Sequence, residues 1–142
     1  LLTRATQLAA FAYLLLLSWF TMAPDPWFPL FGGYGRQVET TVDTSLADAA
    51  QHAGAYGVLG FLLVRAALAG GWPSTGLTVT VAVVHGLVTE LVQYFVPLRT
   101  CDWTDAVSNV AGAAAGAAFA MAVSRVFGTP RAVAQEHSVS SG

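Results

Sequence analysis

The sequence is poor in charge, and its basic residues are all of one type. Only 10% of the 142 residues are charged, lysine is absent, all six basic residues are arginine, and the formal net charge is -2. Soluble domains usually contain about a quarter charged residues. No basic run is present that could neutralise a phosphate backbone, so no nucleic-acid partner is expected.

Cysteine is nearly absent as well. The single Cys101 excludes an internal disulfide and any metal site built from several cysteines, and we interpret it as a loop thiol without function. What the sequence has instead is apolar: 55% of the residues are hydrophobic and the mean hydropathy is +0.60. Such a composition favours the lipid bilayer as the solvent of this chain.

Four stretches are long and apolar enough to cross a membrane, which takes about 20 residues. They cover about residues 6–23, 47–69, 75–96 and 104–127. The first stretch is full length and has no signal-peptide cleavage site before it, so we predict a retained helix there. The sequence therefore predicts an all-α, polytopic membrane protein with four transmembrane helices.

The connections predict how these helices are arranged. The second and third connections, residues 70–74 and 97–103, are short, so consecutive helices must run antiparallel. The result is one four-helix domain over residues 1–127. Residues 128–142 are small and polar and are predicted to form a disordered cytoplasmic tail.

The first connection, residues 24–46, is the longest and is predicted to be a surface loop. Its three prolines prevent a regular helix at its start. Its aromatic residues are typical of the belt at a membrane-water interface, and we interpret the loop as lying on lipid headgroups: Trp27, Phe28, Phe31 and Tyr34.

Arginine placement predicts the orientation, because cytoplasmic loops carry an excess of basic residues. If the N-terminus is cytoplasmic, four arginines lie inside and two outside. The inner four are Arg4, Arg65, Arg125 and Arg131, and the outer two are Arg36 and Arg99. Both termini are therefore predicted to be cytoplasmic in a multi-pass protein of the cell membrane.

Antiparallel packing brings most of the unusual polar residues to one membrane face. Within each span they recur at helical spacing: Asp48, His52 and Tyr56 in the second, Glu90 and Gln93 in the third, and Asp105 and Asn109 in the fourth. Arg99 and Asp102 follow in the loop between the last two spans. With a rise of 1.5 Å per residue, His52, Glu90 and Asn109 fall roughly 6–10 Å below the rim, at one level.

A charged side chain inside the bilayer costs about 2.5–3.5 kcal/mol at the centre, and this cost favours a functional interpretation. We predict that Glu90, His52 and Asp105 form an acid-base or charge cluster. Five further residues are predicted to bind a ligand: Asp48, Tyr56, Gln93, Arg99 and Asn109. The alternative is that these residues fix the helix register, and a carboxylate at a helix N-terminus, such as Asp48 or Asp105, also complements the macrodipole.

Two further features are interpreted as structural. His85 lies roughly 18 Å below the same rim and is expected to pack or to form an interhelical hydrogen bond. The fourth span carries a seam of small residues, and the second offers a similar close-packing surface. The first set is Gly112, Ala113, Gly116 and Ala117, and the second is Gly54, Ala55, Gly57 and Gly60.

The order and spacing of these polar residues resemble the VanZ-like family, named for a teicoplanin-resistance protein. The resemblance covers about residues 48–116, from Asp48 through Glu90 and Pro97 to Gly116. It implies a four-helix membrane protein, linked in the type case to lowered sensitivity to a lipoglycopeptide antibiotic, and no established reaction. Family members often carry a lysine directly after the aspartate, where this chain has Ala49. Arg99 is then the nearest candidate cation.

The first functional hypothesis is an envelope protein whose outward-facing pocket binds an amphiphilic or lipid-linked molecule. Arg99 suits a phosphate or carboxylate, and Glu90 with His52 suits proton transfer. A ligand that is only bound and one that is also modified are both compatible with these residue types. No cofactor is predicted because no compact metal-ligand motif is present, although a divalent cation bridging Asp48, Glu90 and Asp105 would suit their oxygen ligands.

The alternative hypothesis is a non-catalytic accessory subunit of a larger membrane complex. In that case the polar rim would bind a loop of a membrane-protein partner, and the small-residue seams would pack against foreign helices or a second copy of the chain. Transport is a third possibility, but four helices without a detectable repeat would require dimerisation.

Overall fold

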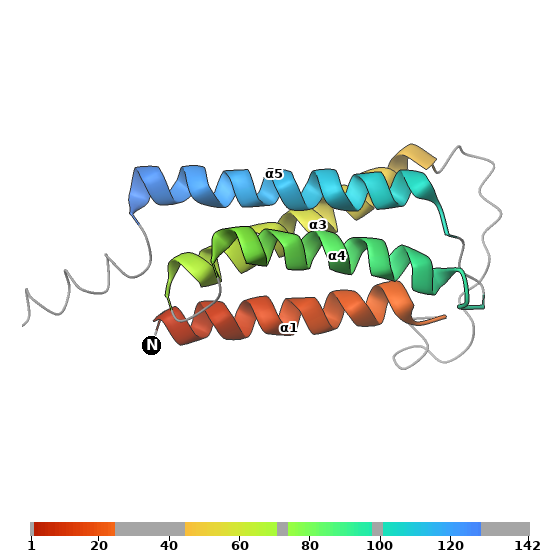
Figure 1. Ribbon diagram of the computed structural model, residues 1–142, viewed down its shortest axis with the longest axis horizontal. Helices are drawn as coiled ribbons and strands as arrows, with labels where there is room; N and C mark the ends of the chain where they lie inside the picture. Colours follow the sequence, from red (N-terminus) through yellow and green to blue (C-terminus); the bar gives the residue numbers. More distant parts are fainter. Residues whose placement is uncertain (1, 25–44, 71–73, 98–100, 129–142) are drawn as a thin grey trace, which may run out of the picture.

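The computed structural model describes residues 2–24, 45–70, 74–97 and 101–128, and within these ranges the chain is helical and contains no strand. Four helices follow one another: α1 (Leu2–Met22), α3 (Ser45–Leu68), α4 (Thr75–Gln93) and α5 (Trp103–Phe127). They lie side by side and run in alternating directions (Figure 1). The structure is thus the predicted antiparallel four-helix bundle.

The helix ends follow from local capping. The Ser74 hydroxyl accepts a 3.4 Å hydrogen bond from the backbone N–H of Leu77 at the start of α4. At the start of α5, the carboxylate of Asp102 accepts a 2.8 Å hydrogen bond from the backbone N–H of Thr104. This bond lowers the pKa of the Asp102 carboxyl from its ordinary value. Helix α4 ends at Gln93, three residues before the predicted Val96, and the chain continues in tight turns. Val96 itself precedes Pro97, and helical torsion angles are unfavourable for a residue before proline.

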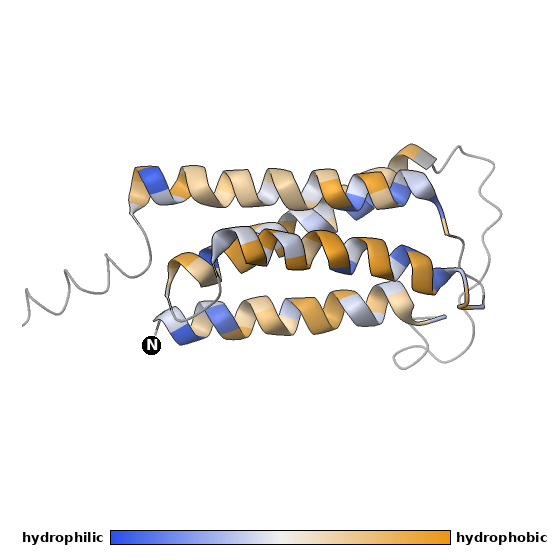
Figure 2. Cartoon of the chain, viewed as in Figure 1, coloured by the Kyte–Doolittle hydropathy of each residue, from blue (hydrophilic) through white to orange (hydrophobic). Residues whose placement is uncertain are grey.

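Three of the helices are long and apolar enough to cross a membrane. They are α1 over Thr3–Met22, α4 and α5, with mean hydropathies of 1.4, 1.6 and 1.6. Their outward surfaces carry large exposed apolar side chains such as Phe11, Leu87 and Phe119. Figure 2 shows hydrophobic residues along most of α4. Because such a large apolar surface is unfavourable in water, we conclude that this is a membrane protein.

Helix α3 lies at the centre of the bundle and packs against each of the other three helices. Its buried residues Tyr56, Leu59 and Leu63 belong to the main hydrophobic cluster. It is not among the helices that are apolar enough to cross a membrane, whereas the sequence predicted a span here, and it carries Gln51 and His52 in its first turns. His52 is partly buried in the bundle, and Gln51 is exposed.

Helices α3 and α5 approach each other closely along their small residues. A Cβ atom added at Gly112 would overlap the backbone of Ala53, and one added at Gly116 would overlap the backbone of Gly57. Gly60 faces the backbone of Ala113 in the same way. The seams expected on these two helices therefore pack against each other, and only small residues allow it.

Several sequence-based predictions concern residues outside the described ranges. They include most of the loop predicted over residues 24–46, with all of its aromatic residues inside the range 25–44, and the predicted tail from residue 129 onward. Arg36, Arg99 and Arg131 also lie outside the described residues.

Candidate functional site

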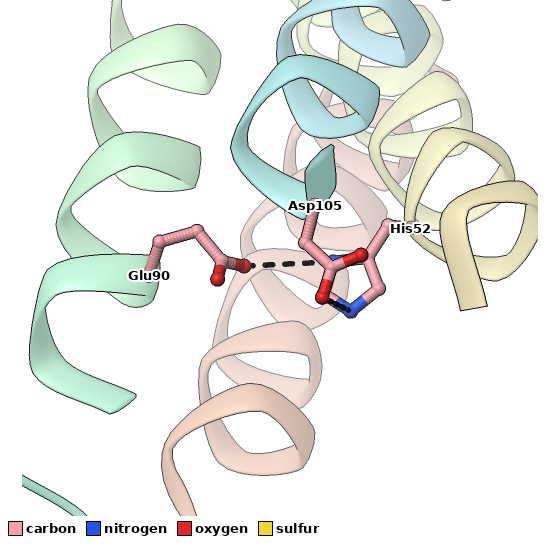
Figure 3. Close-up of side chains that lie close together, drawn as sticks. All are labelled: His52, Glu90 and Asp105. Atoms are coloured by element: carbon pink, nitrogen blue, oxygen red, sulfur yellow. Dashed lines mark ion pairs between the residues drawn. The ribbon is translucent and has the colours of Figure 1, made fainter. Parts of the chain in front are cut away.

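Three ionisable side chains from three helices meet near one end of the bundle (Figure 3). His52 comes from the first turns of α3, Glu90 from the last turn of α4 and Asp105 from the first turn of α5. His52 Nδ1 lies 3.6 Å from Glu90 Oε1, and His52 Nε2 lies 3.7 Å from Asp105 Oδ2. The imidazole therefore stands between the two carboxylates.

Asn109, one turn after Asp105 on α5, holds this cluster together. Its side chain is fully buried. Its Nδ2 donates hydrogen bonds to Glu90 Oε1 at 3.2 Å and to the carbonyl oxygen of Gly86 at 3.4 Å. Its Oδ1 lies 2.9 Å from His52 Nδ1. Because both donor bonds fix the amide orientation, Oδ1 is an acceptor and His52 Nδ1 carries the proton.

Glu90 is the most enclosed member of the cluster. Only 3% of its surface is exposed, although it belongs to a helix that is apolar enough to cross a membrane. Oε1 is bonded to Asn109, whereas Oε2 has no hydrogen-bond partner among the described residues. A buried carboxylate oxygen without a partner is uncommon and is a frequent mark of a binding site.

A second polar network lies deeper in the bundle. His85 Nε2 is 2.9 Å from the hydroxyl of Ser18, and His85 Nδ1 is 3.0 Å from that of Tyr56. The Tyr56 hydroxyl is also 2.8 Å from that of Thr89, which donates to the carbonyl oxygen of Gly86. The Gly86 carbonyl oxygen also accepts from Asn109 Nδ2, so the two networks share this acceptor.

The contact of Ser18 fixes one proton of the deeper network. Ser18 donates to the Leu14 carbonyl oxygen, so its oxygen accepts from Nε2–H of His85. In the neutral imidazole, Nδ1 accepts from the Tyr56 hydroxyl, and the contact between Tyr56 and Thr89 then has no proton of its own, because Thr89 donates to Gly86. His85 thus forms interhelical hydrogen bonds, one of the two roles expected from the sequence, and it connects α4 to α1 and α3.

A half-open cavity of about 430 Å³ lies between α1, α3 and α4, beside the cluster. Part of its wall is polar and part is apolar. The polar part is formed by Gln51, His52, Tyr56, Gln93, Thr21 and Tyr13, and the apolar part by Leu16, Leu17, Phe20 and Ala55. His52 therefore borders both the charge cluster and the cavity.

The structure brings four of the predicted site residues together: His52, Glu90, Asp105 and Asn109. Tyr56 lies one turn deeper, in the His85 network. Gln93 Nε2 donates a 2.9 Å hydrogen bond to the backbone of Thr21 in α1 and also lines the cavity. Asp48 is exposed at the start of α3 and does not join the cluster. The three residues whose ligand atoms lie close enough for one metal ion are His52, Glu90 and Asp105, whereas the sequence suggested Asp48, Glu90 and Asp105.

Sequence reasoning missed the part that α1 plays. The first span was given no role beyond hydrophobicity, yet the Tyr13 hydroxyl donates a 3.0 Å hydrogen bond to the carbonyl oxygen of Ala55 in α3. Ser18 and Thr21 add further bonds to α4. The signal in the sequence is the spacing of Tyr13, Ser18 and Thr21, which share one broad face of an otherwise apolar helix.

Comparison with known proteins bears on this arrangement. The family described as VanZ/LLP1 matches residues 10–125, a region that contains every cluster residue. No curated protein and no solved structure is significantly similar to the chain. Since the family match covers most of the sequence, this chain is a member of the VanZ-like family.

Proposed function

We propose that this protein binds an amphiphilic, lipid-linked molecule of the cell envelope, with its polar head at the cluster and its tail in the cavity. The single observation that carries the proposal is the cavity between α1, α3 and α4, which is lined by the apolar Leu16, Leu17 and Phe20 and also by His52 of the cluster. A site with an apolar wall and a few convergent polar groups suits a ligand that is itself part apolar and part polar.

The residue types at the polar end favour an anionic head group. Gln93 supplies an amide donor in the cavity wall. Arg99 follows α4 in the sequence and suits a phosphate or carboxylate. His52 and Glu90 lie 3.6 Å apart and suit proton transfer, so the bound molecule can also be a substrate. The accessory-subunit hypothesis is not favoured by any contact of the described residues.

The ligand test compares two equal changes in side-chain size. In Ala55→Leu, added bulk at the cavity wall displaces the ligand tail, and binding of a long-chain prenyl phosphate falls about tenfold, as a loss of roughly 1.4 kcal/mol requires. In Ala114→Leu, on the exposed side of α5, binding is unchanged. Native mass spectrometry of the detergent-solubilised full chain measures both, with a neutral lipid of equal tail length as the head-group control.

The same proposal can be tested in cells by measuring antibiotic sensitivity. Expression of the protein is expected to lower sensitivity to teicoplanin and to leave sensitivity to the same antibiotic core without its acyl chain unaffected. Ala55→Leu removes this protection and Ala114→Leu keeps it. Equal prenyl phosphate binding by the two variants, together with equal drug sensitivity, would refute the proposal.

The cluster is proposed to face the outside of the cell. Helix α3 has 24 residues, roughly 36 Å at 1.5 Å per residue, and is therefore long enough to form the fourth pass. With four passes, both termini lie on the same side of the membrane, and the arginine bias favours the cytoplasm for that side.

The native Cys101 tests this orientation because it is exposed and lies at the cluster end of the bundle. A membrane-impermeant maleimide is expected to label it in intact cells. A Cys101→Ser, Val126→Cys double variant moves the thiol to an exposed site at the opposite end and is expected to react only after permeabilisation. The reverse pattern would place the cluster in the cytoplasm.

A further inference from the structure

The Nε2 atom of His52 faces a carboxylate oxygen of Asp105, which cannot donate a hydrogen bond to it. Because Asn109 Oδ1 accepts from Nδ1–H, Nε2 carries a lone pair whenever the ring holds no second proton. Nε2 lies 3.7 Å from Asp105 Oδ2, which is also an acceptor. Two acceptors at this distance repel each other unless a cation stands between them, and that cation is either a proton or a metal ion.

The second unmatched group is the carboxylate of Glu90. Its Oε2 is buried and has no hydrogen-bond partner among the described residues. Among the same residues, His52 is the one basic side chain that forms an ion pair with Glu90 or Asp105. Two carboxylates thus share a single imidazole in a region where unpaired charge is costly.

We propose that His52, Glu90 and Asp105 bind one divalent transition-metal ion, through Nε2 of His52 and one oxygen of each carboxylate. One potential ligand atom from each residue lies within 4.8 Å of the other two. Ligand atoms around a metal ion with bonds of about 2.1 Å are roughly 3–4 Å apart. His52 lies nearest to Asp105 through Nε2 and nearest to Glu90 through Nδ1, so a rotation of Glu90 toward Nε2 is needed to complete the site. All three side chains already converge (Figure 3).

The mixed donor set indicates the kind of ion. Imidazole nitrogen suits zinc and iron, and carboxylate oxygen suits manganese as well, whereas calcium and magnesium are bound mainly by oxygen. Asn109 supplies the outer hydrogen bond that a metal-binding histidine usually makes through its other nitrogen. The same amide orients Glu90 by donating to Oε1, which leaves Oε2 free to bind the ion.

The ion also has a place in the proposed function. His52 borders the cavity, so coordination positions not taken by protein can receive a phosphate or carboxylate from the ligand head. This last step rests on the proposed function, whereas binding of the ion by the three side chains does not. The two are therefore tested separately.

The experiment uses the full-length chain in mild detergent, stripped with a chelator and carrying Cys101→Ser so that the exposed thiol binds no zinc. Titration with Zn²⁺ alone or Mn²⁺ alone, with no lipid added, is expected to give one equivalent per chain. Glu90→Gln and Asp105→Asn are each expected to weaken binding at least tenfold. Asp48→Asn, which removes an exposed carboxylate at the same end, is expected to leave it within twofold.

The Mn²⁺ complex should also show nitrogen hyperfine coupling in its electron spin resonance spectrum, and His52→Gln should abolish that coupling. This measurement on the wild-type cluster does not depend on the folding of any carboxylate variant. The proposal is overturned if no saturable binding occurs, if the cluster variants bind like Asp48→Asn, or if Mg²⁺ competes equally well. It is also overturned if nuclear magnetic resonance shows a proton on both ring nitrogens of His52 in saturating Zn²⁺. Any of these outcomes leaves the prenyl phosphate test unaffected.

Discussion

Gly116→Ala is expected to lower the free energy of unfolding by about 3 kcal/mol, at the upper end of the usual cost of overpacking. The added methyl group would overlap the backbone of Gly57 in α3. Backbone atoms cannot rotate away as a flexible side chain can, so α3 and α5 must move apart. Because α3 carries His52 and α5 carries Asp105 and Asn109, this separation also widens the cluster.

Gly54→Ala is the matched control, since a Cβ atom at Gly54 meets nothing within 4 Å. It adds the same methyl group to α3 and is expected to be neutral or slightly stabilising, because alanine favours helix by up to about 1 kcal/mol over glycine. Unfolding of both variants in mixed micelles, followed by circular dichroism, measures the difference. Equal stabilities would mean that the two helices do not touch along this seam.

The glycines of α3 also show why the sequence alone overestimated this contact. Gly54, Ala55, Gly57 and Gly60 were grouped as one close-packing surface because they are small, and the three glycines among them are three residues apart. Three residues turn a helix by about 300°, so each step rotates the row by about 60° around the axis. Gly57 and Gly60 therefore face α5, and Gly54 has turned away.

The cluster was predictable because two physical rules act together. Short connections force α3, α4 and α5 to alternate in direction, and the helical rise then brings His52, Glu90 and Asn109 to one level. The detailed pairing was not predictable. Which carboxylate faces which ring nitrogen depends on helix rotations that sequence spacing leaves open, and Asp48 accordingly remains exposed while Asp105 joins His52.

The position of α1 could not be predicted for a different reason. A long connection separates it from α3, so the sequence restrains neither its neighbours nor the face that it presents. Its polar residues Tyr13, Ser18 and Thr21 are few enough to pass for ordinary residues of an apolar helix. Only the packed bundle shows that they bind α3 and α4, and that Tyr13 and Thr21 form part of the cavity wall.

Asn109→Ala is the second variant with a large expected effect. It removes the acceptor of His52 Nδ1–H and the donor to Glu90 Oε1, and both groups are then left without that partner inside the bundle. The loss of a hydrogen-bond partner costs about 1–3 kcal/mol for each buried group, so we expect about 3 kcal/mol or more in total. Ser108→Ala, a change at the preceding residue of α5, is expected to cost less than about 0.5 kcal/mol.

A double-mutant cycle separates the role of Asn109 in the cluster from its role in helix packing. If its amide stabilises the protein mainly by satisfying Glu90, then Asn109→Ala should cost less when residue 90 is already leucine, which needs no donor. We expect a coupling of about 1–3 kcal/mol, as found for residues in one polar network. Additive costs in the micelle unfolding assay would contradict this geometry. The variant would then act through lost packing alone, and the orientation of His52 and Glu90 would need another cause.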